Sequence, residues 1–405
     1  MILGFLVQRT PYYKAFAPLI DEALKRGHKV FCFHDYSQPK QGKKAYQFPY
    51  LTSMPRFKNG LAFGLAYKTE DELVKLVLQN QVQIMVSLNY FLAYQGLKDK
   101  LKGVLWAGLQ YSLDAIDEAE HLTEPDKYFF HTTIWLDFAQ KYVKLQGKQI
   151  TKQDSFAFAG FSELDQAKLV DREAIRKKWK IPEQKKVILF LPFPFGSSNY
   201  WFWPKIIYGG HNFVFQFVCA LLSFKPRLIR QVLKRENDKQ LCLALRKFCD
   251  RNDAFLLVKL RKKDPLKPYL AKLADEVVFD ESYYPATIIE CLAVADLCVN
   301  FASTAVIEAV GMAVPNLCIM PPKNDYRHLQ HPLWKLLFEQ FSDFMDFQGV
   351  SQSVSVRDVF RVFKEKTLND FALDSQAQKQ YVDKYIGISE SSKKIADDIE
   401  TMLQK

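Results

Sequence analysis

A segment near residue 300 combines two hydroxyl side chains and one acid in a spacing that suits nucleotide binding. It runs Asp296-Leu-Cys-Val-Asn-Phe-Ala-Ser303-Thr304-Ala-Val-Ile-Glu308-Ala-Val-Gly311-Met-Ala-Val-Pro315-Asn-Leu-Cys-Ile319. The pattern indicates a buried strand, a short loop, a helix, a turn and a second strand. Hydroxyls and backbone N–H groups at the start of a helix bind anions well. Ser303 and Thr304 are therefore predicted to hold a phosphate, and Glu308 a ribose hydroxyl.

A purely structural role for these residues stays open. Ser or Thr before a helix satisfies unpaired N–H groups without any ligand, and such capping is compatible with phosphate binding. Glu308 could also face solvent, but its neighbours Val306 and Val310 are apolar. An acid on a mostly buried helix needs a partner, and a ribose diol is one such partner.

The elements that must position this segment alternate between strand and helix along the chain. Such alternation with short connections predicts parallel sheets with helices on both faces. The predicted strands are 2–7, 29–33, 82–87, 103–107, 127–131, 156–158, 186–191, 254–260, 276–279 and 297–300, and the predicted helices are 11–26, 70–79, 134–145, 172–180, 240–251 and 285–295.

The length of the chain, 405 residues, exceeds that of one ordinary hydrophobic core. We expect an α/β fold of two Rossmann-like, doubly wound parallel-sheet domains that face each other across a cleft. The N-terminal domain is predicted at 1–165 and the C-terminal domain at 166–375. Residues 376–405 are predicted to form a helical tail, which can cross back to the N-terminal domain.

The charge balance points to anionic partners. The formal net charge is +11 and the isoelectric point is near 9.1, which suits phosphorylated substrates, an anionic membrane face or nucleic acid, or serves solubility alone. The basic residues are scattered and no nucleic-acid-binding motif is present, so we expect no nucleic-acid partner.

The cysteines and the apolar runs bear on the compartment of the protein. The seven cysteines form no CxxC pair, and most lie in apolar runs, which is typical of reduced, buried thiols in a cytosolic protein. No zinc or other metal site is predicted.

The apolar start, Met1 to Val7, lacks the basic residues that begin a signal peptide. No apolar run reaches the ~18 residues that a membrane span needs. We expect a cytoplasmic or peripheral protein.

The C-terminal half resembles GT-B fold glycosyltransferases. The resemblance rests on the basic strand and loop at Val258–Pro265, on Tyr283-Tyr-Pro285 before a helix, and on Ser303-Thr304, Glu308, Gly311 and Pro315. The stretch Gln378–Asp398, with Tyr381, Tyr385 and Gly387, is similar to the C-terminal tail of bacterial surface-polysaccharide transferases and of proteins like CDP-glycerol glycerophosphotransferase.

The resemblance implies a metal-independent enzyme that moves a sugar from a nucleotide-sugar to a glycan or lipid-linked acceptor in the synthesis of lipopolysaccharide, capsule or another surface polysaccharide. The N-terminal domain would bind the acceptor and the C-terminal domain the donor, a substrate of the UDP or CMP/CDP type, with no tightly bound cofactor. A polyol-phosphate transferase and a UDP-sugar 2-epimerase are the alternatives. The implied donor-binding residues are Ser303, Thr304, Glu308, Lys259, Arg261, Lys263, Gly196, Ser197 and Tyr284.

One position departs from the family pattern. Many relatives that use CMP or CDP donors carry His-Pro where this chain has Asp264-Pro265, and that His supports the donor phosphate. Its absence argues against a cytidine donor. The neighbouring Arg261 and Lys263 can supply positive charge instead, as the leaving nucleotide gains negative charge, although a solvated basic turn fits them equally well.

An inverting sugar transfer also needs a base that takes the proton of the acceptor hydroxyl. Parallel sheets bind ligands at the carboxyl ends of their strands, and three titratable residues of the N-terminal domain follow predicted strands. They are Asp114 and His34, which we rank first, and His131, which can instead have a local capping role beside Thr132 and Thr133.

A run of aromatic and apolar residues follows the first strand of the C-terminal domain. It contains Trp201 and Trp203, an apolar stretch at 213–224, and then Lys225, Arg227 and Arg230. Trp beside an apolar helix and basic residues suits a membrane interface, which predicts peripheral contact with the inner face of the cytoplasmic membrane. Packing of 213–224 on the core is the alternative.

Overall fold

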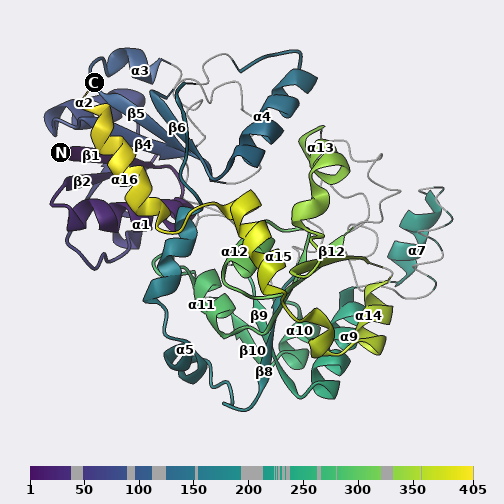
Figure 1. Ribbon diagram of the computed structural model, residues 1–405. Helices are drawn as coiled ribbons and strands as arrows, with labels where there is room; N and C mark the ends of the chain where they lie inside the picture. The colour runs from purple at the N-terminus through teal and green to yellow at the C-terminus, as the bar shows by residue number, and fades with distance from the viewer. Residues whose placement is uncertain are drawn as a thin grey trace. The chain divides into compact units, whose positions relative to one another are not determined.

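The computed structural model (Figure 1) describes most of the chain. The described residues are 1–37, 49–88, 96–111, 125–150, 154–192, 213–222, 224, 226, 229, 233, 238–261, 266–279, 281–320, 332–356 and 358–404. Their contacts divide the chain into two compact units. Unit 1 comprises Met1–Val170, Glu281–Ile289 and Val382–Lys405, and unit 2 comprises Asp171–Asp280 and Glu290–Tyr381.

Unit 1 is built on a seven-stranded parallel sheet with strand order β3-β2-β1-β4-β5-β6-β7. Its strands are almost continuously apolar, because parallel strands that carry helices on both faces are buried on both. The strands are β1 Ile2–Val7, β2 Lys29–Asp35, β3 Phe63–Tyr67, β4 Ile84–Leu88, β5 Leu105–Leu109, β6 Lys127–Phe130 and β7 Phe156–Phe158, and the helices are α1 Tyr13–Lys25, α2 Glu70–Gln79, α3 Leu97–Lys100, α4 Thr133–Leu145 and α16 Ser391–Met402.

Alternate residues of each strand face opposite layers of helix. Phe5 of β1 packs in one core cluster with side chains of α1 and α16, such as Ile20 and Ile399. Leu6, the next residue, packs in a second cluster with side chains of α2 such as Leu73. Unit 1 is thus a three-layer α/β domain, with α1 and α16 side by side on one face (Figure 1).

Unit 2 repeats this architecture with a six-stranded parallel sheet of order β10-β9-β8-β11-β12-β13. Its core cluster packs α9 and α14 against apolar side chains of β8, β9 and β11. The strands are β8 Lys186–Leu191, β9 Ala254–Lys259, β10 Glu276–Val278, β11 Leu297–Phe301, β12 Asn316–Met320 and β13 Ser351–Ser355, and the helices are α5 Arg172–Lys178, α7 Phe213–Leu222, α9 Asp238–Arg251, α10 Pro268–Leu273, α11 Thr287–Val294 (which begins in unit 1), α12 Ala305–Gly311, α13 Pro332–Gln340, α14 Val359–Glu365 and α15 Ser375–Tyr381.

These two sheets confirm the predicted fold class, a pair of doubly wound parallel α/β domains. The predicted strands are present, with shifts of one or two residues at several ends. Two edge strands, β3 and β13, were not predicted. Six of the cysteines are free and buried. None of the helices in the described part of the chain has the length and apolar character that a membrane span requires.

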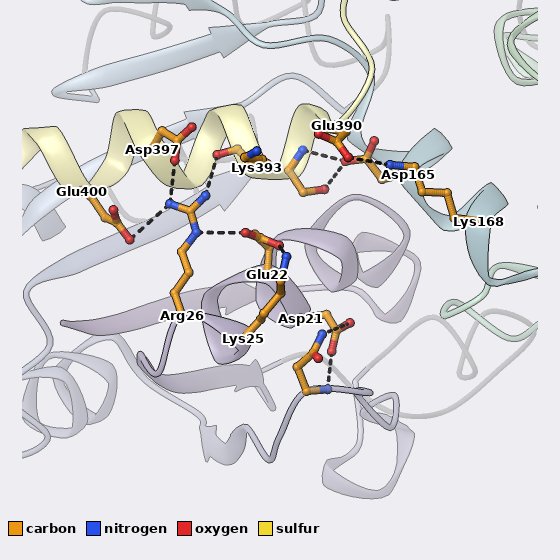
Figure 2. A network of polar contacts seen from close by, with 12 residues as sticks. Asp21, Glu22, Lys25, Arg26, Asp165, Lys168, Glu390, Lys393, Asp397 and Glu400 are labelled. Atoms are coloured by element: carbon orange, nitrogen blue, oxygen red, sulfur yellow. Dashed lines mark hydrogen bonds and ion pairs between the residues drawn. The ribbon is translucent and has the colours of Figure 1, made fainter.

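The C-terminal helix α16 is fastened to α1 by a network of charges around Arg26 (Figure 2). The Arg26 guanidinium donates to Glu22 in its own helix at 3.0 Å, and it lies 2.8 Å from Asp397 and 3.3 Å from Glu400 in α16. Burial acts to raise the pKa of the Glu400 carboxyl, but hydrogen bonds from His28 and Arg26 outweigh it, so that this pKa is lowered. The part of the tail from Val382 onward therefore belongs structurally to unit 1, whereas α15 belongs to unit 2.

The start of α16 is capped by a residue that is distant in sequence. Asp165 accepts hydrogen bonds from the backbone N–H of Ser392 at 2.7 Å, from that of Ser391 at 3.3 Å and from the Ser392 hydroxyl. Glu390, the N-cap residue itself, forms no capping bond. The first N–H groups of a helix have no partner within the helix, so Asp165 fixes where α16 begins.

Candidate functional site

The strand order marks one place in each sheet where a ligand is expected. The order reverses between β1 and β4 in unit 1, and between β8 and β11 in unit 2. Open parallel sheets bind ligands outside the carboxyl ends of the strands at such switch points. Each candidate residue can therefore be judged by its distance along the strands from these two points.

In unit 2 the loop with Ser303 and Thr304 leaves β11 at the switch point. Asn300 of β11 pairs in register with Leu191, the last residue of β8. The chain then turns at Ala302, whose φ of +35° is rare for a residue with a side chain; such strain is often found at functional sites. Ser303 and Thr304 follow at once and are partly exposed. Both therefore lie at the edge of the sheet where a ligand is expected.

The two hydroxyls differ in their local bonds. Ser303 Oγ accepts a hydrogen bond from the N–H of Ala305 at 3.2 Å, as the capping alternative anticipates. Thr304 makes no side-chain capping bond. The Ser303 hydroxyl therefore helps to cap α12 and can still donate its hydrogen to a ligand. The Thr304 hydroxyl does not cap the helix.

A buried row of polar side chains supports this loop from below. Asn300 Oδ1 accepts from the N–H of Ser303 at 3.4 Å, and Asn300 Nδ2 donates to Asn316 Oδ1 in β12. Asn316 donates in turn to Ser351 Oγ in β13 at 2.9 Å, and this hydroxyl donates to the Met345 carbonyl at 2.8 Å. Asn300, Asn316 and Ser351 are all buried. Buried amides persist only when they are hydrogen-bonded, so this row fixes the loop position.

Glu308 lies on α12 and is only 5% exposed. The solvent-facing alternative is therefore wrong, and the apolar flanks of Glu308 are the reason, since Val306, Ile307, Ala309 and Val310 are buried as well. A carboxylate in such surroundings must be held by hydrogen-bond donors. The burial agrees with the expectation that this acid has a defined partner.

Lys259 reaches the same edge of the sheet from the other side of β8. It is the last residue of β9, and its preceding neighbour Val258 pairs with Phe190. Strands lie about 4.8 Å apart, so Lys259 and the Ser303 loop begin roughly 10 Å apart across β8. The Lys259 ammonium donates to the Leu260 carbonyl at 2.7 Å, and Arg261 is exposed. Lys263, Gly196 and Ser197 lie outside the described residues.

Tyr284, which the resemblance assigns to the donor site, is grouped with unit 1. Its hydroxyl donates to Asp21 of α1 at 2.8 Å, and its ring lies against Phe57. Burial and the bond to Asp21 raise the pKa of the Tyr284 hydroxyl. Asp21 also accepts two bonds from Asn59, both 2.9 Å long. The visible role of the Tyr284 hydroxyl is thus to fasten the segment 281–289 to α1.

In unit 1 the predicted histidines lie at the carboxyl edge of the seven-stranded sheet. His34 is the penultimate residue of β2 and is fully buried, with Nε2 2.6 Å from the Tyr13 hydroxyl. His131 directly follows β6. Asp114, ranked first as a base, lies outside the described residues.

His131 is held by its neighbour across the sheet, Gln110, which follows β5. The N–H of His131 donates to Gln110 Oε1 at 3.0 Å, and Nε2 lies 3.2 Å from the Gln110 carbonyl. A carbonyl only accepts, so Nε2 carries the proton and Nδ1 carries the lone pair. Burial lowers the pKa of the His131 imidazole to about 3, so the ring is neutral at physiological pH.

Nδ1 of His131 and the hydroxyl of Ser87, in β4 at the switch point, are buried at this edge and have no hydrogen-bond partner among the described residues. Leaving such atoms unpaired costs about 1–3 kcal/mol each, which suggests that a ligand or water satisfies them. Sequence reasoning missed Ser87 and Gln110, although a polar residue at the end of an apolar strand is a usable signal for both.

In the described part of the chain no cluster of three or more His, Cys, Asp or Glu side chains could hold a metal ion.

Comparison with known proteins identifies the fold. No protein-family profile and no curated protein sequence matches the chain. Solved structures do match over nearly its whole length. A putative UDP-N-acetylglucosamine 2-epimerase from Listeria monocytogenes has a TM-score of 0.60 at 10% identity, covering 99% of this chain and 96% of that one. The wall teichoic acid polymerase TagF, soaked with CDPG, has a TM-score of 0.59 at 12% sequence identity. The match covers 100% of this chain and 89% of that one.

The Neisseria meningitidis UDP-GlcNAc 2-epimerase, solved with UDP-GlcNAc bound, is also similar, with a TM-score of 0.56 at 9% identity and full coverage of both chains. At these identities the likeness concerns the fold. The chain therefore has the GT-B fold of the proteins that its C-terminal half resembles.

Proposed function

We propose that this protein is an enzyme of surface-polysaccharide synthesis that transfers a sugar from a nucleotide-sugar donor to a glycan or lipid-linked acceptor without a metal ion. The observation that carries the proposal is the position of Ser303, Thr304 and Glu308 at the switch point of unit 2. The GT-B fold supports it, because similar structures include one bound to UDP-GlcNAc.

The donor would be held through its phosphates and its ribose. The hydroxyls of Ser303 and Thr304 and the ammonium of Lys259 are suited to the phosphates, on which negative charge develops as the sugar leaves. Arg261 and Lys263 can add to this charge. Glu308 is suited to the ribose diol, because the two oxygens of a carboxylate can accept hydrogen bonds from two neighbouring hydroxyls.

The acceptor hydroxyl would be oriented at the carboxyl edge of the unit 1 sheet. Nδ1 of neutral His131 can accept a hydrogen bond from it. An imidazole with so low a pKa is a weak base, so we assign His131 to orientation. Asp114 and His34 remain the proposed bases.

A nucleotide screen by thermal shift tests the donor site. At about 100 times its Kd, the correct member of UDP, CDP, CMP, GDP and ADP should stabilise the fold by ~2.7 kcal/mol, a rise in Tm of roughly 5–10 °C. Glu308→Gln and Ser303→Ala should abolish most of the shift, whereas the control Glu365→Gln, at the end of α14, should keep it. A shift that survives in both site variants would disprove the assignment.

A UDP-sugar 2-epimerase is the second candidate, because several of the similar structures are UDP-GlcNAc 2-epimerases. The two activities separate in one assay. An epimerase converts UDP-GlcNAc to its 2-epimer without any acceptor, whereas a transferase leaves the donor intact until an acceptor is added. A polyol-phosphate transferase would instead be indicated by stabilisation with CDP alone.

We also propose that the protein binds the anionic inner face of the cytoplasmic membrane through α7. Trp201 and Trp203, on which the sequence-based prediction rests, lie outside the described residues, but α7 supports the idea. Its apolar residues Val214, Val218, Leu221 and Leu222 are 44–69% exposed at helical spacing, and Phe224 is 88% exposed. Three basic residues follow at 225–230, which suits an interfacial helix.

Flotation with vesicles rich in phosphatidylglycerol should recover the protein, and neutral phosphatidylcholine vesicles should recover much less. Replacing Val218 and Leu222 together by Asp should lower the bound fraction by roughly tenfold or more, because each charge must enter the apolar layer. Leu61→Asp, at a position 84% exposed in unit 1, is the matched control. Equal flotation of the two variants would exclude α7 as the contact.

A further inference from the structure

We propose that the turn of π-helix at Val382–Ile386 is the element that positions His131, acting through Thr132 and Trp135. This role rests on the proposed function, which gives Nδ1 of His131 its use. The turn begins where the chain re-enters unit 1 after Tyr381. Single π-turns are rare and often accompany functional sites.

Two carbonyls of the π-turn accept hydrogen bonds from residues that closely follow His131. Carbonyls in the last turn of a helix have no partner within the helix. Here the Lys384 carbonyl accepts from the Thr132 hydroxyl at 2.7 Å, and the Tyr385 carbonyl accepts from Trp135 Nε1 at 2.9 Å. Thr132 is the residue after His131, and Trp135 lies in the first turn of α4. The indole and the Tyr385 ring also pack together, with centroids 5.9 Å apart.

Gly387, just after the π-turn, brings the two backbones into close approach. Its φ is +86°, and a methyl group added to it would lie 2.9 Å from the His131 carbonyl and 3.1 Å from the Thr132 side chain. Only glycine fits such a position without displacement. The same His131 carbonyl accepts from the N–H of Gly160 at 3.0 Å, so both the π-turn and the end of β7 hold this peptide in place.

These contacts hold His131 in place and leave one polar atom of its side chain, Nδ1, for a ligand. Its N–H and Nε2 bind Gln110, its carbonyl binds Gly160, and its ring lies edge-on to Phe161 with centroids 4.6 Å apart. The bond to Gln110 determines the tautomer of the His131 ring. The bonds of Thr132 and Trp135 determine the position of the backbone next to His131. Nδ1 is therefore presented in one orientation, which is the condition for an effective hydrogen-bond partner of a reacting group.

The Thr132 hydroxyl offers a test with matched controls. Thr132→Val keeps the shape and removes the donor, Thr132→Ser keeps the donor, and Thr133→Val alters the exposed neighbour. Diethyl pyrocarbonate modifies neutral imidazoles that it can reach, and peptide mass mapping reports His131 separately from the other six histidines. We expect modification of His131 to be roughly tenfold faster in Thr132→Val and Trp135→Phe, and unchanged in Thr132→Ser and Thr133→Val.

The rate of sugar transfer should be affected in the same variants whose His131 is modified faster. Once a nucleotide-sugar substrate is found, kcat should fall by roughly tenfold to a hundredfold in Thr132→Val, while the donor KM and the nucleotide-induced rise in Tm should stay the same. Modification rates equal to wild type in both Thr132→Val and Trp135→Phe would overturn the positioning role. Faster modification without sugar transfer from any nucleotide-sugar would overturn the proposed function and leave the positioning role supported.

Discussion

Replacing Gly160 by alanine should lower the free energy of unfolding of unit 1 by about 2–5 kcal/mol. Gly160 has φ +81°, and a methyl group there would lie 2.6 Å from the Ile388 carbonyl and 2.5 Å from the Ser391 hydroxyl. The left-handed backbone costs a residue with a side chain about 1–2 kcal/mol, and overpacking adds about 1–3 kcal/mol. A backbone carbonyl cannot rotate away as a side chain can, so the start of α16 must move.

Gly147 provides the matched control. It has a similar φ of +75°, but a methyl group there meets nothing within 4 Å. Gly147→Ala should therefore cost only the backbone part, about 1–2 kcal/mol. Hydrogen exchange of α16 amides is the suitable measurement, because two units need not unfold together. Faster exchange in Gly160→Ala alone is expected, and equal exchange in the two variants would contradict close packing of the start of α16 against Gly160.

Asn300→Ala should lower the stability of unit 2 by about 2–4 kcal/mol. It removes the donor to Asn316 and the acceptor of the Ser303 N–H, both within a buried row. Each buried group left without a partner costs about 1–3 kcal/mol, and the vacated volume adds to this. Because the row supports the Ser303 loop, the nucleotide-induced rise in Tm should fall as well.

Denaturant unfolding, followed by hydrogen exchange in β11 and β12, measures the effect. Asn369→Ala, at an exposed position, is the control and should change stability by no more than about 0.5 kcal/mol. If Asn300→Ala is as stable as this control, the buried row does not hold the loop. If stability falls but nucleotide binding is unchanged, the row supports the sheet without positioning Ser303.

The local patterns predicted most of the fold because buried parallel strands are recognisable without their neighbours. β1, β8 and β11 are continuous apolar runs bounded by polar turns, and each was predicted. β3 and β13, which lie at sheet edges, were not predicted, because their sequences lack such a run. Only part of an edge strand needs to be apolar. Ser351–Ser355 is mostly Ser and Gln, and Phe63–Tyr67 contains a glycine, so neither carries a strand signal of its own.

The residues of the candidate site likewise differ in whether the sequence alone predicted them. Ser303, Thr304 and Glu308 were found from sequence because they lie within one strand–loop–helix unit. Strand order decided what no local pattern contains, namely that this unit lies at a switch point beside β8. The role of Gln110 also depended on the tertiary structure, because Gln110 binds His131 at the end of the neighbouring strand.

The sequence by itself determined the elements, the two-domain α/β class and the chemistry available in the Ser303 segment, because periodicity and residue type are local properties. Only the tertiary structure decided that Asp165 caps α16, that Tyr284 is bonded to Asp21, and that the π-turn holds Thr132. Each of these bonds joins residues more than 200 positions apart. Such contacts form only when the assembled sheets bring distant segments together, so no stretch of sequence specifies them alone.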